Sequence, residues 1–314
     1  MIKGIKRIST VGMSREDWLA ERRKSIGGSD AAAVCGLSKW ESPYSVWANK
    51  RGLTPEKEQT EAMRQGRDLE GYVAERFCEG TGLKVRRENA ILINPKYPFA
   101  HANVDRMIVG EDAGLECKFT SSLNIKRFKD VEFPEDYYVQ CVHYLAVTGC
   151  LRWYLAVLVA GRAFYMFELK RDEDEIKSLM DQEAEFWHGY VETGTEPPIE
   201  GSEATAETID AIYLSDAGGD CDLSLYESDL KTYLNLGEKI SNLKHEREEI
   251  ANNIKLYMKD DRYGFSTIAS VSWTSSVRER FDVASFKRDH PGVYSRYIKT
   301  SPVRTFRISA INSN

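Results

Sequence analysis

Polar and apolar residues alternate in the stretch GLECKFT in a way that is typical of a β-strand. Leu115, Cys117 and Phe119 are separated by Glu116 and Lys118. Side chains two residues apart point to the same face of a strand, so Glu116 and Lys118 share one face. A weak ion pair on a solvated strand edge is the ordinary interpretation of such neighbours. A pair of active-site groups is the alternative.

The same periodicities predict further helices and strands over the first two thirds of the chain. Helix-capping residues and helical spacing predict helices after Ser14, after Gly27-Gly28 with Ser29 or Asp30 as the cap, after Ser42, and over 61–80, 136–148 and 172–191. Alternation and turn residues predict strands over 83–93, 99–109, 115–120, 151–160 and 163–169.

The last third of the chain has a different pattern. A Pro-, Gly- and Ser-rich stretch at 193–205 predicts a boundary between a core of residues 1–200 and an appendage of residues 201–314. A long helix is predicted over about 223–260, and the tail is expected to alternate strand, helix and strand. Apolar residues in this helix follow a heptad-like spacing at Leu236, Ile240, Leu243, Ile250, Ile254 and Tyr257. This seam predicts a packed helix or helical hairpin, with a true coiled coil as the alternative.

Composition is that of a soluble protein with a sizeable core. The chain has 314 residues, 42% of them hydrophobic and 29% charged, which predicts one large domain or a core domain with an appendage. It has no apolar run of about 18 residues, and its first residues lack the apolar region of a signal peptide. Its 6 Cys residues form no CxxC pair. They are expected to be reduced thiols in a cytoplasmic protein, neither disulfides nor a zinc site.

Charge is distributed unevenly. The formal net charge is -6, which by itself argues against a nucleic-acid partner. Residues 171–230 account for this with 2 Lys+Arg against 18 Asp+Glu, whereas residues 1–60 have 11 against 7 and residues 271–310 have 8 against 3. Two locally basic regions are therefore compatible with a path for DNA despite the acidic total.

The strand before the turn at 110–114 adds a second carboxylate. If the two strands pair, Asp105 reaches the face on which Glu116 and Lys118 lie. Two converging carboxylates are typical ligands of a hard divalent cation such as Mg²⁺ or Mn²⁺. The neighbouring ammonium of Lys118 could orient or deprotonate a water, or stabilise charge that develops on a phosphate.

Three further residues extend this constellation. Glu70, in a predicted helix upstream, could bring another carboxylate to the metal. Gln140 and Tyr144 are four residues apart and share one face of the helix that follows the strand. Each has an ordinary alternative, since Glu70 could be a solvated helix residue and Tyr144 a core residue.

The order of these residues resembles a known superfamily. Helix-Glu, strand-Asp, strand-Glu-x-Lys and helix-Gln-xxx-Tyr resemble the PD-(D/E)xK nucleases, in the RecB-like branch, although Val104 replaces the proline before Asp105. The stretches RRKSIGGSDAAAVCGLSKWESPYSVWANKRG and GRDLEGYVAERF resemble the YqaJ-like viral recombinase family, which is related to the lambda-type phage alkaline exonucleases. The resemblance runs from about Arg22 to Trp187.

The resemblance implies a fold and a set of roles. The fold would be α/β, with a restriction-endonuclease-like core (a mixed sheet flanked by helices) and a C-terminal helical appendage with a small β element. Asp105 and Glu116 would be metal ligands, Glu70 would hold or orient a second metal or its water, Lys118 would be the catalytic lysine, and Gln140 would orient the site or contact the terminal nucleotide. With lysine in that role, His101 is not expected to be the base, and His143 is expected to be a packing residue.

The resemblance also implies how a DNA end is held. Arg22 and Ser29 match positions that contact the 5′-phosphate, as an arginine fork and a hydroxyl at a helix start can. Asn103 lies where relatives often have a serine, and Asn103 could donate to the same phosphate. A surface arginine and a plain helix cap are the alternatives for Arg22 and Ser29.

The implied activity is that of a Mg²⁺-dependent 5′-to-3′ exonuclease that degrades one strand at double-stranded DNA ends and leaves a 3′ single strand. Mn²⁺ is expected to substitute. The implied partners are a second and third copy in a ring-shaped trimer and a single-strand-annealing protein, with no membrane. The implied location is the cytoplasm of a bacterial host carrying the phage or prophage. The alternatives are an endonuclease or single-strand exonuclease of the same fold, or a non-catalytic DNA-binding or assembly protein.

Overall fold

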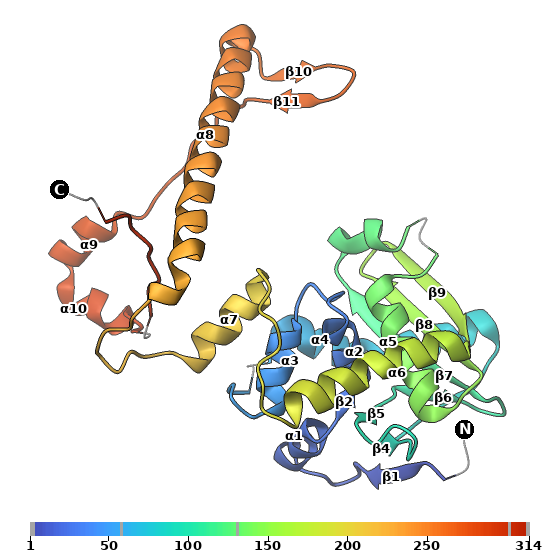
Figure 1. Ribbon diagram of the computed structural model, residues 1–314. Coiled ribbons are helices and arrows are strands. Elements are labelled where there is room, and N and C mark those ends of the chain that lie inside the picture. The colour runs from blue at the N-terminus through green and yellow to red at the C-terminus, as the bar shows by residue number, and fades with distance from the viewer. Residues whose placement is uncertain (1–3, 57–58, 130–131, 301–302, 312–314) are drawn as a thin grey trace. The chain divides into compact units, whose positions relative to one another are not determined.

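The computed structural model describes residues 4–56, 59–129, 132–300 and 303–311 (Figure 1). The chain divides into two units, Met1–Tyr213 and Leu214–Asn314. The first unit ends after helix α7 (Glu203–Ile212), which packs against helix α3 (Pro43–Lys50). Among the described helices, none is both long and apolar enough to cross a lipid bilayer.

A five-stranded mixed sheet is the centre of the first unit. Its strands, in spatial order, are β3 (Val85–Arg87), β6 (Arg106–Ile108), β7 (Ala113–Thr120), β8 (Arg152–Val159) and β9 (Ala163–Lys170). Strands β7 and β8 pair in parallel and the other neighbours pair antiparallel. Strand β7 is therefore an interior strand, with hydrogen-bonded neighbours on both sides. The predicted 151–160 and 163–169 hairpin is confirmed.

Helices cover both faces of this sheet (Figure 1). The remaining helices of the unit are α1 (Arg15–Arg23), α2 (Gly28–Val34), α4 (Glu61–Thr81), α5 (Glu135–Thr148) and α6 (Glu173–Phe186), with short helical segments at Ser122–Arg127 and Trp187–Val191. On one face α4 packs Val73 and Phe77 against Leu115 of β7. Helix α5 packs on β8 and β9 and against α2 and α6. This confirms the predicted mixed sheet flanked by helices.

Two predicted strands are wrong as continuous elements. The 83–93 strand breaks into β3 and β4 (Ala90–Ile93), and the 99–109 strand breaks into β5 (Ala100–His101) and β6. The halves have different partners: β4 pairs with β1 (Lys6–Ser9), and β5 pairs with β2 (Ile26–Gly27) in parallel. The chain leaves one sheet to join another, which an alternating sequence pattern does not reveal.

The helix starts follow the predicted caps except at α2. Ser14 and Ser42 accept hydrogen bonds from the first turns of α1 and α3. Neither Ser29 nor Asp30 caps α2, because the helix already begins at Gly28. Asp30 lies inside the first turn, and its Oδ2 accepts a hydrogen bond of 2.8 Å from the backbone N–H of Gly27.

In the described residues, the second unit contains a long helix, a hairpin and four short helical segments. Its elements are a turn at Ser224–Tyr226, α8 (Glu227–Met258), β10 (Tyr263–Phe265), β11 (Ser270–Ser272), α9 (Val283–Asp289), α10 (Pro291–Tyr294) and a turn at Ser295–Tyr297. The predicted helix and first strand are present, but no strand follows α10 among the described residues. The heptad-like seam of α8 is exposed, with Leu243 63% and Ile250 62% accessible. Within the second unit the seam is therefore not packed, contrary to the prediction.

Gly114 provides a test of how tightly the central strand is packed. A Cβ atom at Gly114 of β7 would overlap the indole ring of the buried Trp153. We expect Gly114→Ala to lower the free energy of unfolding of the first unit by about 1–3 kcal/mol, because overpacking strains a well-filled core. Urea denaturation followed by tryptophan fluorescence measures this.

Gly66→Ala is the matched control. Gly66 lies in the interior of α4 with open space around the position of a Cβ atom. Alanine there should raise the stability by up to about 1 kcal/mol through helix propensity. A Gly114→Ala variant as stable as the unmodified protein would contradict the packing of Trp153 against β7.

Candidate active site

Strand β7 places Glu116 and Lys118 side by side in a largely buried position. The Lys118 Nζ atom lies 2.6 Å from Glu116 Oε1, and the Glu116 side chain is only 4% exposed. Burial alone would lower the pKa of Lys118, but the Glu116 carboxylate raises it above its ordinary value, so the side chain is an ammonium at neutral pH. The interpretation as a solvated edge pair is therefore wrong, since β7 is an interior strand.

Asp105 lies directly beside this pair. It precedes β6 in a link between strands, and the pairing of Arg106 with Leu115 brings it next to Glu116. Its Oδ2 accepts a hydrogen bond of 2.8 Å from the backbone N–H of Cys117. Burial, together with the negative charges of Glu116 and Glu70, raises the pKa of the Asp105 carboxyl well above its usual range. Two buried carboxylates whose negative charges repel each other favour a proton or a cation between them.

Helix α5 contributes the predicted glutamine and tyrosine. The Gln140 amide donates to Glu116 Oε1 at 2.9 Å and to the Tyr144 hydroxyl at 2.8 Å. The Tyr144 hydroxyl in turn donates to the backbone carbonyl of Asn103 at 3.2 Å. Both side chains are buried, with 6% and 3% of their surface exposed. Tyr144 is thus a core residue that also connects Gln140 to the segment before Asp105.

Arg22 and Ser29 come together at the start of α2. The Arg22 Nη2 group donates to Ser29 Oγ at 2.9 Å, and the guanidinium lies 4.6 Å from the centre of the Trp18 ring. Arg22 and Trp18 line a cavity of about 510 Å³. Ser29 is exposed but does not line this cavity, so of this pair the arginine alone faces it.

Gly28 links this pair to the buried carboxylates. A Cβ atom there would lie 2.5 Å from the ring of Tyr144, so only glycine lets the two segments approach so closely. Ser29 therefore follows a residue in contact with Tyr144, whose hydroxyl binds both Gln140 and the Asn103 carbonyl. Four separate stretches of sequence therefore meet around Gln140 and Tyr144 of α5: this helix, the start of α2, the Asn103 segment and strand β7.

Two buried oxygen atoms in this region have no partner within the described part of the chain. They are Glu116 Oε2 and Asn103 Oδ1. Buried polar atoms are nearly always satisfied, so an unpaired one marks a place for a ligand, an ion or water. Tyr144 lies between the two segments, because its hydroxyl donates to the Asn103 carbonyl and its ring lies against Gly28, the residue before Ser29.

Glu70 is held differently from the other carboxylates. It comes from α4, which packs on the Leu115 face of β7, and it accepts a hydrogen bond from the buried Arg106 guanidinium. Within the ranges that the structure describes, no three His, Cys, Asp or Glu side chains are arranged to hold one metal ion. Asp105 and Glu116 have the oxygen chemistry of a hard-cation site, whereas Glu70 is turned toward Arg106.

Sequence reasoning missed two residues that touch this site. Arg106 holds Glu70, and its position directly after Asp105 was the available signal. Tyr137 lies under Lys118, with Nζ 5.2 Å from the ring centre, and Arg127 lies 4.7 Å from the same ring. Tyr137 precedes Gln140 by three residues on the same helix, so helical spacing could have found it.

Two histidines near the site are structural. His101 is 1% exposed and shares a hydrogen bond of 2.8 Å with Ser25 Oγ, and burial lowers its pKa well below the ordinary value. His143 shares hydrogen bonds of 2.8 Å with the buried Glu183 and with the His101 carbonyl. Both rings are thus held by hydrogen bonds inside the fold.

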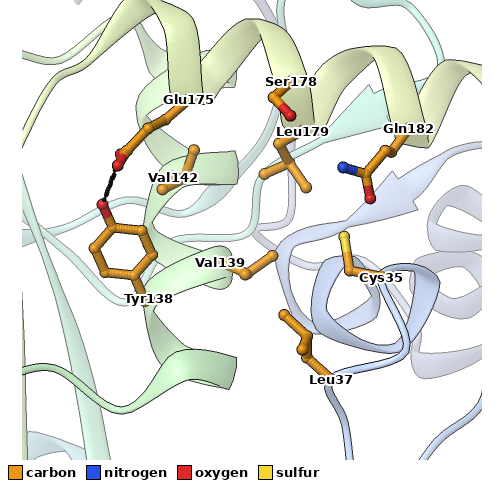
Figure 2. Close-up of a pocket in the computed structure, with 9 residues that line it drawn as sticks. All are labelled: Cys35, Leu37, Tyr138, Val139, Val142, Glu175, Ser178, Leu179 and Gln182. Atoms are coloured by element: carbon orange, nitrogen blue, oxygen red, sulfur yellow. Dashed lines mark hydrogen bonds between the residues drawn. The ribbon is translucent and has the colours of Figure 1, made fainter.

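A separate cavity lies between α2, α5 and α6 (Figure 2). Figure 2 shows Tyr138 of α5 bonded through its hydroxyl to Glu175 of α6, with Cys35 and Leu37 on the opposite wall. Its volume is about 320 Å³. None of the predicted site residues lines it, so it is distinct from the carboxylate site.

Comparison with known proteins agrees with this geometry. Residues 17–151 match the model of the YqaJ-like viral recombinase domain. The uncharacterized protein YqaJ of Bacillus subtilis (strain 168) is 42% identical over 305 residues, covering 96% of each chain. The alkaline exonuclease LHK-Exo of Laribacter hongkongensis, alone and in complex with dAMP, superposes with a TM-score of 0.50 at 21% identity, covering 58% of this chain and 94% of that chain.

The mixed sheet flanked by helices is thus a restriction-endonuclease-like fold of the kind found in alkaline exonucleases. More particularly, the chain belongs to the YqaJ-like viral recombinase family. This confirms the resemblance drawn from its motifs. The match to the alkaline exonuclease leaves 42% of this chain uncovered, so the protein carries sequence beyond that fold.

Asp30 and Lys50 fix the backbone around Arg22 and Ser29. Lys50 Nζ lies 2.6 Å from Asp30 Oδ2 and 3.0 Å from the backbone carbonyl of Arg22. Burial would raise the pKa of Asp30, but the positive charges of Lys50 and Arg22 hold it well below the usual range. The pair therefore anchors both ends of the Arg22–Ser29 segment.

We expect Asp30→Asn to lower the free energy of unfolding by about 3–5 kcal/mol at pH 7, because it leaves a buried ammonium unpaired. A carboxylate whose pKa is lower in the folded protein than in the unfolded chain stabilises the fold at every pH above its pKa in the unfolded chain. This stabilisation is lost as the pH falls toward its pKa in the folded protein. The difference in the free energy of unfolding between the variant and the unmodified protein should thus stay constant from pH 8 to about 5 and shrink below about pH 4. Chemical denaturation across this pH range measures it.

The double variant Asp30→Asn, Lys50→Met is the control. Replacing both charges leaves no unpaired ion, so it should recover most of the loss. Equal instability of the single and double variants would contradict the ion pair as the cause.

Proposed function

We propose that this protein is a metal-dependent exonuclease that degrades one strand of duplex DNA from its 5′ end and leaves a 3′ single strand. The observation that carries the proposal is the contact chain from the buried Glu116–Lys118 pair through Gln140 and Tyr144 to the Asn103 segment. Gly28, which lies against the Tyr144 ring, and Ser29, which accepts a hydrogen bond from Arg22, bring the arginine close to this chain of contacts. Membership in the recombinase family supports the same activity.

Asp105 and Glu116 would hold the cation, Mg²⁺ in the cell or Mn²⁺ in its place, with Glu70 as a further ligand if it leaves Arg106. Such a cation lowers the pKa of bound water and polarises a phosphoryl oxygen. The Lys118 ammonium would stabilise charge that develops on the scissile phosphate. Gln140 holds Glu116 by its Oε1 atom, which leaves the unpaired Oε2 free to act as a ligand.

Arg22, Ser29 and Asn103 would hold the terminal 5′-phosphate. Water attacks the next phosphorus, and the bond from that phosphorus to the 3′ oxygen of the terminal nucleotide breaks. The leaving oxygen takes a proton, the mononucleotide departs, and the shortened strand keeps a new 5′-phosphate. Each cycle thus regenerates the group that the arginine recognises, which favours exonuclease over endonuclease action.

Assembly and partners complete the proposal. Three copies would form a ring around the duplex, and a single-strand-annealing protein would coat the 3′ strand, in the cytoplasm of a bacterial host. The family resemblance supports these points. The basic balance of residues 1–60, 11 Lys+Arg against 7 Asp+Glu, supports a surface for DNA within an acidic chain.

Lys118→Ala should reduce the rate of strand degradation by about 100-fold or more, because it removes charge stabilisation from the transition state. The measurement is digestion of a linear duplex with separately labelled strands, with Mg²⁺ or with EDTA. The matched control is Lys170→Ala, at the exposed end of the edge strand β9, which should retain full activity. Activity in EDTA, or full activity of folded Lys118→Ala, would contradict the proposed site.

Arg22→Gln should abolish the preference for a 5′-phosphorylated end. The unmodified protein should digest the strand with a 5′-phosphate faster than the same strand with a 5′-hydroxyl, since a charge-assisted contact to phosphate contributes about 1.5–3 kcal/mol. Lys24→Gln is the control, because Lys24 is exposed and pairs with Glu21 on the surface. A preference that survives Arg22→Gln would remove Arg22 from the phosphate pocket.

A further inference from the structure

The last part of the second unit is basic and rich in exposed aromatic side chains. Residues 278–307 contain 8 Lys+Arg against 3 Asp+Glu, in a chain whose net charge is -6. Among their aromatic side chains, Phe281 is 69% exposed, and Tyr297 and Phe306 are each 82% exposed. We call residues 278–307 the basic aromatic segment.

The positive charges of this segment are largely unneutralised. Five of its basic side chains form no ion pair with a described residue: Arg278, Arg280, Arg296, Lys299 and Arg307. Arg288 pairs with Asp289 on the surface, and Lys287 lies 5.5 Å from the centre of the Tyr294 ring. Asp282 is engaged as the cap of α9. Those five charges are therefore available to an external anion.

The aromatic residues divide into an ordered cluster and exposed rings. Phe281 and Phe286 lie 4.9 Å apart, and Phe286 lies 5.3 Å from His290, which organises α9. Tyr297 and Phe306 present most of their ring surface to solvent. Exposed rings interleaved with unpaired guanidinium and ammonium groups are the chemistry with which proteins bind single strands, because bases stack on the rings and phosphates pair with the cations.

We propose that the basic aromatic segment binds single-stranded DNA. Duplex DNA has the phosphates but its bases are already stacked, so it leaves the exposed rings unused. An acidic protein partner would satisfy the charges but not the repeated planar faces. The choice of DNA rests on the proposed function, in which each turnover of the nuclease lengthens a 3′ single strand that this segment would hold.

The test is binding of a fluorescein-labelled dT20 oligonucleotide, followed by anisotropy, to the full chain carrying Lys118→Ala in EDTA. The double variant Tyr297→Ala, Phe306→Ala should bind at least 10-fold more weakly, because each stacked base contributes about 1–3 kcal/mol. A 20-base-pair duplex should bind no more weakly to this variant than to its parent.

The matched control is Tyr257→Ala, Phe265→Ala. These rings are 88% and 83% exposed in the same unit but lie outside the segment. Their removal should leave dT20 affinity unchanged. Separately, Arg296→Gln, Lys299→Gln should reduce the slope of log affinity against log salt by about 1.4, since each phosphate contact to a single strand contributes about 0.7.

Two outcomes would overturn the inference. Unchanged dT20 affinity in Tyr297→Ala, Phe306→Ala would assign the surface to a different partner, such as a protein. Equal weakening of dT20 and duplex binding would show that the rings do not stack on unpaired bases. The binding assay needs no metal and no cleavage, so it separates this inference from the proposed function. If the unmodified protein does not cleave DNA but the segment still binds dT20, the proposed nuclease alone is refuted. If the protein cleaves DNA but Tyr297→Ala, Phe306→Ala leaves dT20 affinity unchanged, this inference alone is refuted.

Discussion

The burial of the Glu116 carboxylate is the constraint on which the first unit depends. A carboxylate with 4% of its side chain exposed is strongly destabilising unless charge and hydrogen bonds compensate it. Lys118 and Gln140 both engage Oε1, while Oε2 has no partner in the described chain. The fold thus pairs one oxygen of this carboxylate and leaves the other unpaired.

That constraint determines how distant parts of the chain must meet. Gln140 can reach Glu116 only if α5 lies on the Glu116 face of β7, and Tyr144 then lies between Gln140 and Gly28. The short parallel pairing of Ile26–Gly27 with Ala100–His101 holds the Arg22–Ser29 segment beside the link that carries Asp105. A shift of any one of these segments changes the geometry of both the carboxylates and the arginine.

Whether the sequence predicts a contact in this site depends on how far apart the two residues lie in the sequence. The period of a strand places Glu116 and Lys118 together, and the period of a helix places Gln140 and Tyr144 together, so both pairs follow from local pattern. Asp105 followed from a hairpin register, although the strand expected to carry it is interrupted. These positions are geometric findings, and the roles of the residues remain predictions.

The rest depends on contacts that no local pattern encodes. Arg106 follows Asp105 directly, so its side chain points to the opposite face of the sheet. There it contacts Glu70 of α4, which lies 36 positions away in the sequence. Gly28 precedes a predicted helix, but no local pattern shows that a side chain there would overlap the Tyr144 ring. The seam of α8 had the spacing of a packed helix, and periodicity alone does not say whether the partner belongs to the same chain.

The net charge of the chain and the charge of its short surfaces also have to be considered separately. Residues 171–230 carry 18 acidic against 2 basic side chains, so the chain as a whole repels a polyanion. For the proposed nuclease, attraction to DNA would come from short surfaces within about a Debye length, roughly 8–10 Å at physiological salt, of the phosphates they contact. Such a protein should release DNA readily wherever those surfaces are not engaged. An acidic total then favours specificity for ends and single strands, because nonspecific adhesion to duplex DNA is suppressed.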